Sequence, residues 1–290
     1  MKHEDIEQIS LIGQFAGFIA ARWTSGFPHS YPITKHPAWN RWRARHGGVN
    51  APWSCNSLSQ AAEFWCWTYN PKEPSFSALA QALQGAIATG DEALAEQVCW
   101  RIYRWGGVAR KPNDHSAVWL RQAAQEARLT GALRDAVTLL SPGCTKALDR
   151  FNAEDLPMTS ATTKLYAAAA SGGEVAIYDG RVGAALGLLA RQFLESRQIA
   201  GVPDALCFMW GSPQAAEQKA ARTRDPSDAS YRFLELPNGP GSHRVRAALS
   251  RRTNLLVREV VELLAAQGIT ATPLELERSL FMVGYCVRPG

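Results

Sequence analysis

Two residues of the sequence, Lys164 and Asp179, have side chains of the types that could take part in covalent chemistry. Lys164 ends the run Met158-Thr159-Ser160-Ala161-Thr162-Thr163-Lys164, and Asp179 follows 15 positions later. A lysine amine is a nucleophile only when unprotonated, which requires a pKa well below the ~10.4 of an exposed lysine. A carboxylate can stabilise a developing positive charge or accept a proton. Each residue also has a structural interpretation, because a surface lysine is usually solvated and an aspartate before glycine is commonly a helix N-cap.

The elements that must position these residues are mostly helices, since apolar residues recur at helical spacing. Thr272-Pro273-Leu274-Glu275 is a capping box with proline at the first helical position, which predicts a closing helix over 273–285. Extended structure is expected only at 175–178 and near Phe233, and loops at 211–230 and 237–243. The other predicted helices are 58–69, 75–89, 91–105, 114–130, 132–140, 145–151, 161–170 and 182–195.

The fold class expected from this pattern is mainly α, without a clear N-terminal sheet domain. Residues 1–55 are rich in Trp, Pro and Arg and show little periodicity, so no structure is predicted for them. Residues 56–290 are expected to form one helical domain that holds the candidate residues near 158–182. A chain of 290 residues with 46% hydrophobic residues can bury a sizeable core without metal or disulfide support.

Positive charge is concentrated in two windows that contain no acidic residue, although the net charge is only +5. One window lies between Glu7 and Glu63, the other between Glu235 and Glu259. Such windows favour a surface that meets a polyanion, while an ordinary solvated face is the alternative. Their basic residues are Arg22, Lys35, Arg41, Arg43 and Arg45 in the first, and Arg244, Arg246, Arg251, Arg252 and Arg258 in the second.

The cysteines and histidines do not show the spacing of a metal site. The six cysteines are scattered, without a C-x-x-C pair, and the six histidines lack ligand spacing. No metal and no cofactor is therefore expected. The N-terminus lacks the pattern of a signal peptide, and no apolar run approaches the length of a membrane span. The sequence predicts a cytoplasmic protein without a membrane partner or an obligate protein partner.

The stretch 158–182 resembles the 8-oxoguanine glycosylase branch of the helix-hairpin-helix DNA glycosylase superfamily. In that family a hairpin Leu-Pro-Gly-Val-Gly precedes a nucleophilic lysine that opens a helix, and a catalytic aspartate begins the next helix. Lys164 and Asp179 match those two residues, and the pattern T-K-L…I-Y-D-x-R-V is similar to that of a bacterial group with this fold. The resemblance covers about 130–285. The spacing of 15 is shorter than the family's, and Ser160 and Thr162 stand at the hairpin's glycine positions.

The resemblance implies a base pocket and the cleavage of an N-glycosidic bond. Residues 277–285 resemble the family's last helix, so Phe281 would stack on a flipped base and Glu277 would face its edge. Tyr178 is assigned to the same pocket, and the small Ala168 would leave room for a bulky base. Bond cleavage builds positive charge on the deoxyribose, which a carboxylate such as Asp179 would stabilise. Attack by Lys164 would form an imine, whereas attack by water would stop at the abasic site.

Several polar residues are predicted to contact double-stranded DNA. The hydroxyls of Ser160 and Thr162 would contact a phosphate in place of the hairpin's backbone amides. The first basic window interleaves Trp39 and Trp42 with arginines, a composition that suits stacking and phosphate contact. The arginines assigned to DNA binding are Arg41, Arg43, Arg244 and Arg246.

These expectations give a DNA glycosylase that excises a modified base. Some bacterial proteins of this fold are phage-defence enzymes that remove glucosylated 5-hydroxymethylcytosine, and Glu277 and Ala168 favour that substrate, since a carboxylate accepts from the amino group of cytosine. Oxidised-purine repair is the alternative within the class. A helical DNA-binding protein without catalysis and a helical protein-interaction module are alternatives from other classes.

Overall fold

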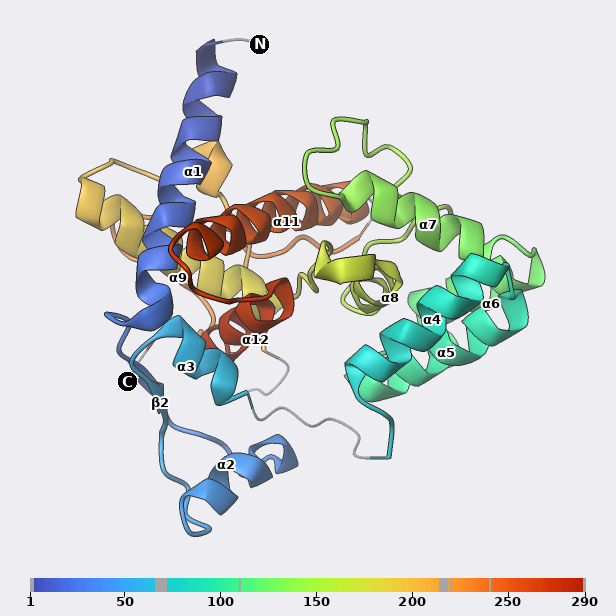
Figure 1. Cartoon of the computed structure of the whole chain (residues 1–290), viewed down its shortest axis with the longest axis horizontal. Helices are drawn as coiled ribbons and strands as arrows, with labels where there is room; N and C mark the ends of the chain where they lie inside the picture. The colour runs from blue at the N-terminus through green and yellow to red at the C-terminus, as the bar shows by residue number, and fades with distance from the viewer. Residues whose placement is uncertain are drawn as a thin grey trace. The chain divides into compact units, whose positions relative to one another are not determined.

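The computed structural model describes residues 3–65, 72–109, 111–213, 219, 221–239 and 241–288, with side chains from residue 11 onward. The chain is mainly helical, as the sequence predicts (Figure 1). It divides into two compact units. Unit 1 comprises Met1–Trp67, Asp179–Leu236 and Leu256–Gly290, and unit 2 comprises Thr68–Tyr178 and Pro237–Leu255. The second boundary between the units along the chain therefore falls directly before Asp179.

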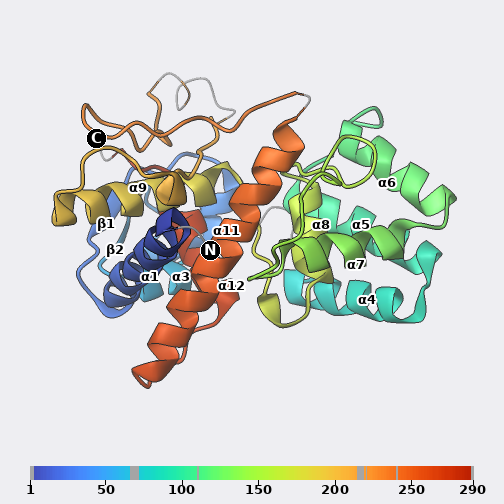
Figure 2. The same ribbon diagram turned by 90° about the horizontal axis from the view of Figure 1, so that it is seen from above.

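Unit 2 is a helical bundle around one apolar core. Helices α4 (Phe76–Thr89), α5 (Glu92–Gly106), α6 (His115–Gln125) and α7 (Leu129–Leu140) lie side by side (Figure 2). The short helix α8 (Thr162–Ala169) packs against α4, α5 and α7. Leu83, Ile102, Leu133 and Leu165 are fully buried in this core. The unit also holds η2 (Ser171–Gly173) and the first part of α11 (Ser242–Ala266).

Capping residues set the ends of the predicted helices in unit 2. Ser75 accepts from the backbone of Ala78 at the start of α4, and Gly90 ends that helix with a φ of 69°. Asp91 accepts from Leu94 N at the start of α5, as the sequence predicts. The single helix predicted over 114–130 is wrong, because the chain breaks after α6 at Ala127, whose φ is 52°. The helix predicted at 145–151 is also wrong, since these residues form turns.

Unit 1 gathers the N-terminal residues with the second and third segments of the chain. Helix α12 (Pro273–Val283) packs against α3 (Leu58–Glu63) and α9 (Gly180–Arg197). Strands β1 (His29–Tyr31) and β2 (Trp53–Cys55) form a small antiparallel sheet with His29 opposite Cys55. The remaining elements are α1 (His3–Thr24), η1 (Pro37–Trp39), α2 (Asn40–Arg45), η3 (Asp204–Leu206) and the last part of α11.

The small sheet is fastened to the end of α12. The Tyr31 hydroxyl donates to Met282 O at 2.6 Å, and the His29 Nε2 atom lies 2.9 Å from Cys286 O. The Tyr31 ring stacks on Trp53 and on Tyr285. The segment 1–55, for which no structure is predicted from sequence, thus supplies side chains that contact the end of α12.

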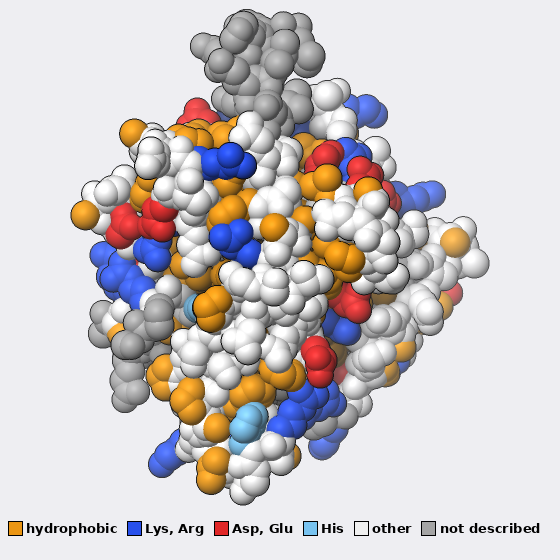
Figure 3. Space-filling model, turned by 60° about the vertical axis from the view of Figure 1, so that its left-hand side comes forward, with side chains coloured by type: hydrophobic (Ala, Val, Ile, Leu, Met, Phe, Trp, Pro, Cys, Tyr) orange, Lys and Arg blue, Asp and Glu red, His pale blue; other side chains and the backbone are white. Residues whose placement is uncertain are grey.

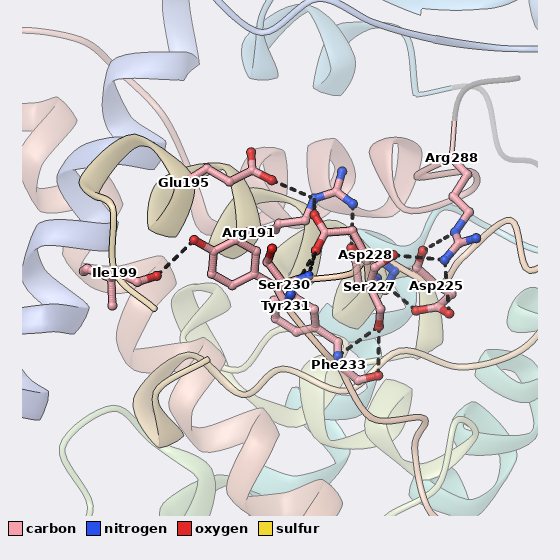
Figure 4. Close-up of polar contacts among 11 residues, drawn as sticks. Arg191, Glu195, Ile199, Asp225, Ser227, Asp228, Ser230, Tyr231, Phe233 and Arg288 are labelled. Carbon is pink, nitrogen blue, oxygen red and sulfur yellow. Dashed lines mark hydrogen bonds and ion pairs between the residues drawn. The ribbon is translucent and has the colours of Figure 1, made fainter. Parts of the chain in front are cut away.

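A polar network holds the loop 225–233 on α9 (Figure 4). The Arg191 Nη1 atom donates to Pro226 O at 2.9 Å, and the Tyr231 hydroxyl donates to Ile199 O at 2.9 Å. One carboxylate oxygen of Asp228 accepts from the backbone N–H groups of Ser230 and Tyr231, both at 2.8 Å. The network fixes the chain on the C-terminal side of Arg224.

Candidate active site

Lys164 lies in unit 2 on α8, and the turn that leads into this helix is closed by hydrogen bonds among its own residues. The Thr159 hydroxyl oxygen accepts from the backbone N–H groups of Ala161 and Thr162, both at 3.1 Å. The Thr162 hydroxyl accepts from Thr159 N at 2.9 Å and donates to Pro157 O. Because these hydroxyls satisfy backbone groups that no helix bond reaches, the chain turns directly into α8. Lys164 is consequently placed in the first turn of that helix.

The Lys164 side chain is only 8% exposed and is held at both its stem and its end. Its Nζ donates to Ser160 O at 2.6 Å. Its stem passes over Gly106, the last residue of α5, where an added Cβ would lie 2.6 Å from Lys164 Cδ and 2.8 Å from Cε. Lysine is rarely buried to this extent. The absence of a side chain at Gly106 provides the space for the stem.

Asp179 lies in unit 1 as the N-cap of α9. Its Oδ1 accepts from Arg181 N at 2.8 Å and from Val182 N at 3.2 Å. Its Oδ2 accepts from Arg181 Nη1 at 3.4 Å, and the side chain is 8% exposed. The structural interpretation of Asp179 is therefore confirmed. This capping contact does not exclude a catalytic role for Asp179, because both backbone N–H groups donate to the same carboxylate oxygen, Oδ1.

The residues that directly precede Lys164 and Asp179 are hydrogen-bonded to each other within unit 2. Tyr178 N donates to Thr163 Oγ1 at 3.1 Å. The same segment is fixed at Ala176, whose N–H donates to Asn254 Oδ1 at 3.0 Å. Residues 175–178, which the sequence predicts as extended, do not pair as a strand. Their backbone is held by side chains instead.

The N-terminus of α9 and the C-terminus of α12 meet closely in unit 1. A Cβ at Gly284 would lie 1.8 Å from Arg181 O, so only glycine fits there. The Arg181 guanidinium carbon lies 4.5 Å from the centre of the Phe281 ring and 5.9 Å from that of Tyr285. A second close approach joins Gly180 and Gly211, whose N–H donates to Gly180 O at 3.1 Å. The backbone beside Asp179 is thus held on two sides.

The structure places the predicted pocket residues differently from one another. Phe281 and Glu277 are half-buried on α12, and Tyr178 is 3% exposed. Ala168 is fully buried within the apolar core of unit 2, and its carbonyl accepts from Gln84 Nε2 at 3.0 Å. The expectation that Ala168 leaves room for a base is corrected, because neighbouring side chains fill the space around it.

The residues predicted to contact DNA also separate by exposure. Ser160 is exposed, whereas the Thr162 side chain has no exposed surface and its hydroxyl is bonded to Pro157 O. Thr162 in this conformation offers nothing to a phosphate, which corrects its assignment. Trp39 and Trp42 are buried in unit 1, so neither ring is available for base stacking. In each case, tertiary packing determines whether the side chain is exposed to solvent or buried.

Among the four predicted arginines, Arg41 is exposed on α2, whereas the others make hydrogen bonds within their units. Arg43 donates to Asn40 Oδ1 at 2.7 Å and to Thr34 O at 3.0 Å. Arg246 donates to Pro237 O at 3.0 Å, and Arg244 pairs with the exposed Asp149 at 3.1 Å. On the face drawn in Figure 3, basic side chains lie among acidic and apolar ones, so its charge is mixed in sign.

One buried cation near Asp179 escapes sequence reasoning. Arg224 is 9% exposed and lies in a segment that the sequence predicts to be a surface loop. Burial, followed by the like charge of Arg181, lowers its pKa to about 9, and Asp179 opposes the change. No spacing or motif singles out Arg224, since its partners come from distant parts of the chain.

Among the described residues, no cluster of three or more His, Cys, Asp or Glu side chains could hold a metal ion. No helix in the part of the chain that the structure describes combines the length and apolar character needed to span a membrane. Compared with known protein families, curated proteins and solved structures, the chain matches none.

Proposed function

We propose that this protein is a DNA N-glycosylase of the helix-hairpin-helix fold that excises a modified base from double-stranded DNA in the cytoplasm. The observation that carries the proposal is the hydrogen bond between Thr163 and Tyr178, the residues that directly precede Lys164 and Asp179. Both candidate residues are largely buried, and each is held by short hydrogen bonds. A turn leading into a lysine-bearing helix, followed by an aspartate that caps the next helix, is the arrangement that the family resemblance implies.

The proposed chemistry assigns one role to each residue. The Asp179 carboxylate stabilises the positive charge that develops on the deoxyribose as the glycosidic bond breaks. The Lys164 amine either attacks C1′, which gives an imine, or supports attack by water. Phe281 stacks on the extruded base, and Glu277 accepts from its exocyclic amino group.

The proposed substrate is glucosylated 5-hydroxymethylcytosine of phage DNA, which makes the protein an antiviral defence enzyme. Glu277 supports this choice because a carboxylate pairs with the amino group of cytosine and suits an acceptor-bearing edge less well. Its half-buried position on α12 leaves part of the side chain accessible. Oxidised-purine repair is the competing activity, and it predicts a different released base.

The test is incubation with genomic DNAs of known modification, followed by mass spectrometry of the released bases. The set contains DNA with glucosylated 5-hydroxymethylcytosine, DNA with the unglucosylated base, DNA carrying 8-oxoguanine and unmodified DNA. We expect release from the first only, and loss of release with Lys164→Gln. Release of 8-oxoguanine would instead identify the protein as an oxidised-purine repair enzyme. Tight DNA binding without release of any base would indicate a DNA-binding protein without catalysis.

A further inference from the structure

Arg224 carries a buried guanidinium whose hydrogen-bonding capacity is largely unused. The side chain is 9% exposed, and its Nη1 donates to Gly211 O at a long 3.4 Å. Its buried Nε meets no acceptor. A guanidinium presents five N–H donors, and a buried donor left without a partner destabilises the fold, more so when the group is charged. Such a group in a folded protein needs an explanation, and a role in binding a ligand is one.

The charges around Arg224 leave unit 1 with an excess of positive charge at this place. Arg181 acts on Arg224 as a like charge, and Asp179 as an opposite one. The Asp179 carboxylate is already occupied, since it caps α9 and accepts from Arg181. Asp225, the next residue along the chain, pairs with Arg222 at 2.6 Å and with Arg288 at 3.4 Å. The carboxylates of Asp179 and Asp225 are therefore both engaged by groups other than Arg224.

We propose that Arg224, together with Arg181, forms a site for one phosphate group. The planar fork of an arginine matches two oxygens of a phosphate, and a guanidinium is the cation best suited to a recessed ion pair. The two arginines come from neighbouring backbone, because the Gly211 whose carbonyl accepts from Arg224 donates its own N–H to Gly180 O, and Gly180 directly precedes Arg181.

The phosphate has two sources, a free phosphate ion or a phosphodiester of a nucleic acid backbone. The glycosylase proposal favours the second, but the site follows from the arginines alone. Its test therefore uses ligands that contain no excisable modified base. Nuclear magnetic resonance titrations at constant ionic strength compare inorganic phosphate, dithymidine monophosphate and the uncharged methylphosphonate analogue of that dinucleotide.

The variants are Arg224→Met, which removes the charge, and Arg224→Lys, which keeps the charge and loses the fork. Arg232→Met is the matched control, because Arg232 lies in the same unit with its side chain exposed. We expect the wild type and Arg232→Met to bind the phosphodiester and not the methylphosphonate. Arg224→Met should weaken binding by about tenfold to a hundredfold, and Arg224→Lys by less. Tight binding of inorganic phosphate with none of the dinucleotide would assign the site to the free ion.

Folding is measured beside binding, and we expect the melting temperature of Arg224→Met to be unchanged or raised, since exchanging a buried charge for an apolar chain is often neutral or stabilising. If Arg224→Met does not fold, Arg224→Lys alone decides the matter. Equal affinity of all variants, or no binding of either phosphate by the wild type, would overturn the site and make Arg224 a structural cation. The base-release assay is separate, so failure of this site leaves the glycosylase proposal standing.

Discussion

Gly106 supports Lys164 from a different helix, and adding one methyl group there should misplace the amine. In Gly106→Ala the new Cβ would lie 2.6 Å from Lys164 Cδ, whereas ordinary contacts are 3.4–4 Å. The lysine stem must therefore move by about 1 Å, a displacement that is enough to cost about a hundredfold in a positioned reaction. The movement also disturbs the 2.6 Å hydrogen bond from Nζ to Ser160 O.

The assay is the rate of base release under single-turnover conditions, together with the free energy of unfolding. Because Gly106 ends α5, alanine should change stability by no more than about 1 kcal/mol, so lower activity cannot be ascribed to unfolding. Gly85→Ala is the matched control, since Gly85 lies within α4 and nothing approaches its Cβ position within 4 Å. It should gain about 0.5–1 kcal/mol in stability and keep full activity. Full activity in Gly106→Ala would refute the positioning of Lys164 by this contact.

Three further outcomes are expected. Borohydride added during turnover should trap the wild type on its DNA substrate and should fail with Lys164→Gln; base release without an adduct would make water the nucleophile and Lys164 a positioning residue. Gly284→Ala should lose about 3 kcal/mol in chemical denaturation, because its Cβ would lie 1.8 Å from Arg181 O, whereas Gly131→Ala, with nothing within 4 Å, should not; equal stabilities would disprove the tight junction of α9 and α12. Arg41→Ala should flatten the salt dependence of DNA binding by about 0.9 in log–log slope, and Arg43→Ala should instead lower stability; an unchanged slope in Arg41→Ala would show that Arg41 makes no phosphate contact.

Local signals predict the helices whose ends are set by nearby residues. Ser75, Gly90 and Asp91 cap or end α4 and α5 at the predicted positions, and the capping box at Thr272 starts α12. The break between α6 and α7 depends on Glu92, whose carboxylate accepts from the N–H groups of Leu129 and Thr130. Glu92 precedes Leu129 by 37 positions, so the residues near the break do not reveal this cap.

The long helices α1 and α11 were not predicted, although both contain apolar residues. Their apolar residues alternate with small and basic ones, and burial is supplied by elements from distant parts of the sequence. The same reason explains the errors at the site. Whether Thr162 and Ala168 face solvent or the core depends on the helices packed around α8, and the isolation of Arg224 depends on the segments folded around it. The family resemblance indicates Lys164 and Asp179 as candidates, but it does not predict their surroundings in this chain.

Base release by Asp179→Asn is the most direct test of the central claim that the Asp179 carboxylate takes part in breaking a glycosidic bond. Asparagine caps helices as well as aspartate, so Oδ1 can still accept from Arg181 N and Val182 N while the charge is removed. Asp91→Asn makes the same exchange at the N-cap of α5 and controls for the effect of capping. We expect Asp179→Asn to bind DNA normally and to release the modified base at least about a hundredfold more slowly, with Asp91→Asn at the wild-type rate. Equal rates for all three proteins would contradict the proposed function of Asp179.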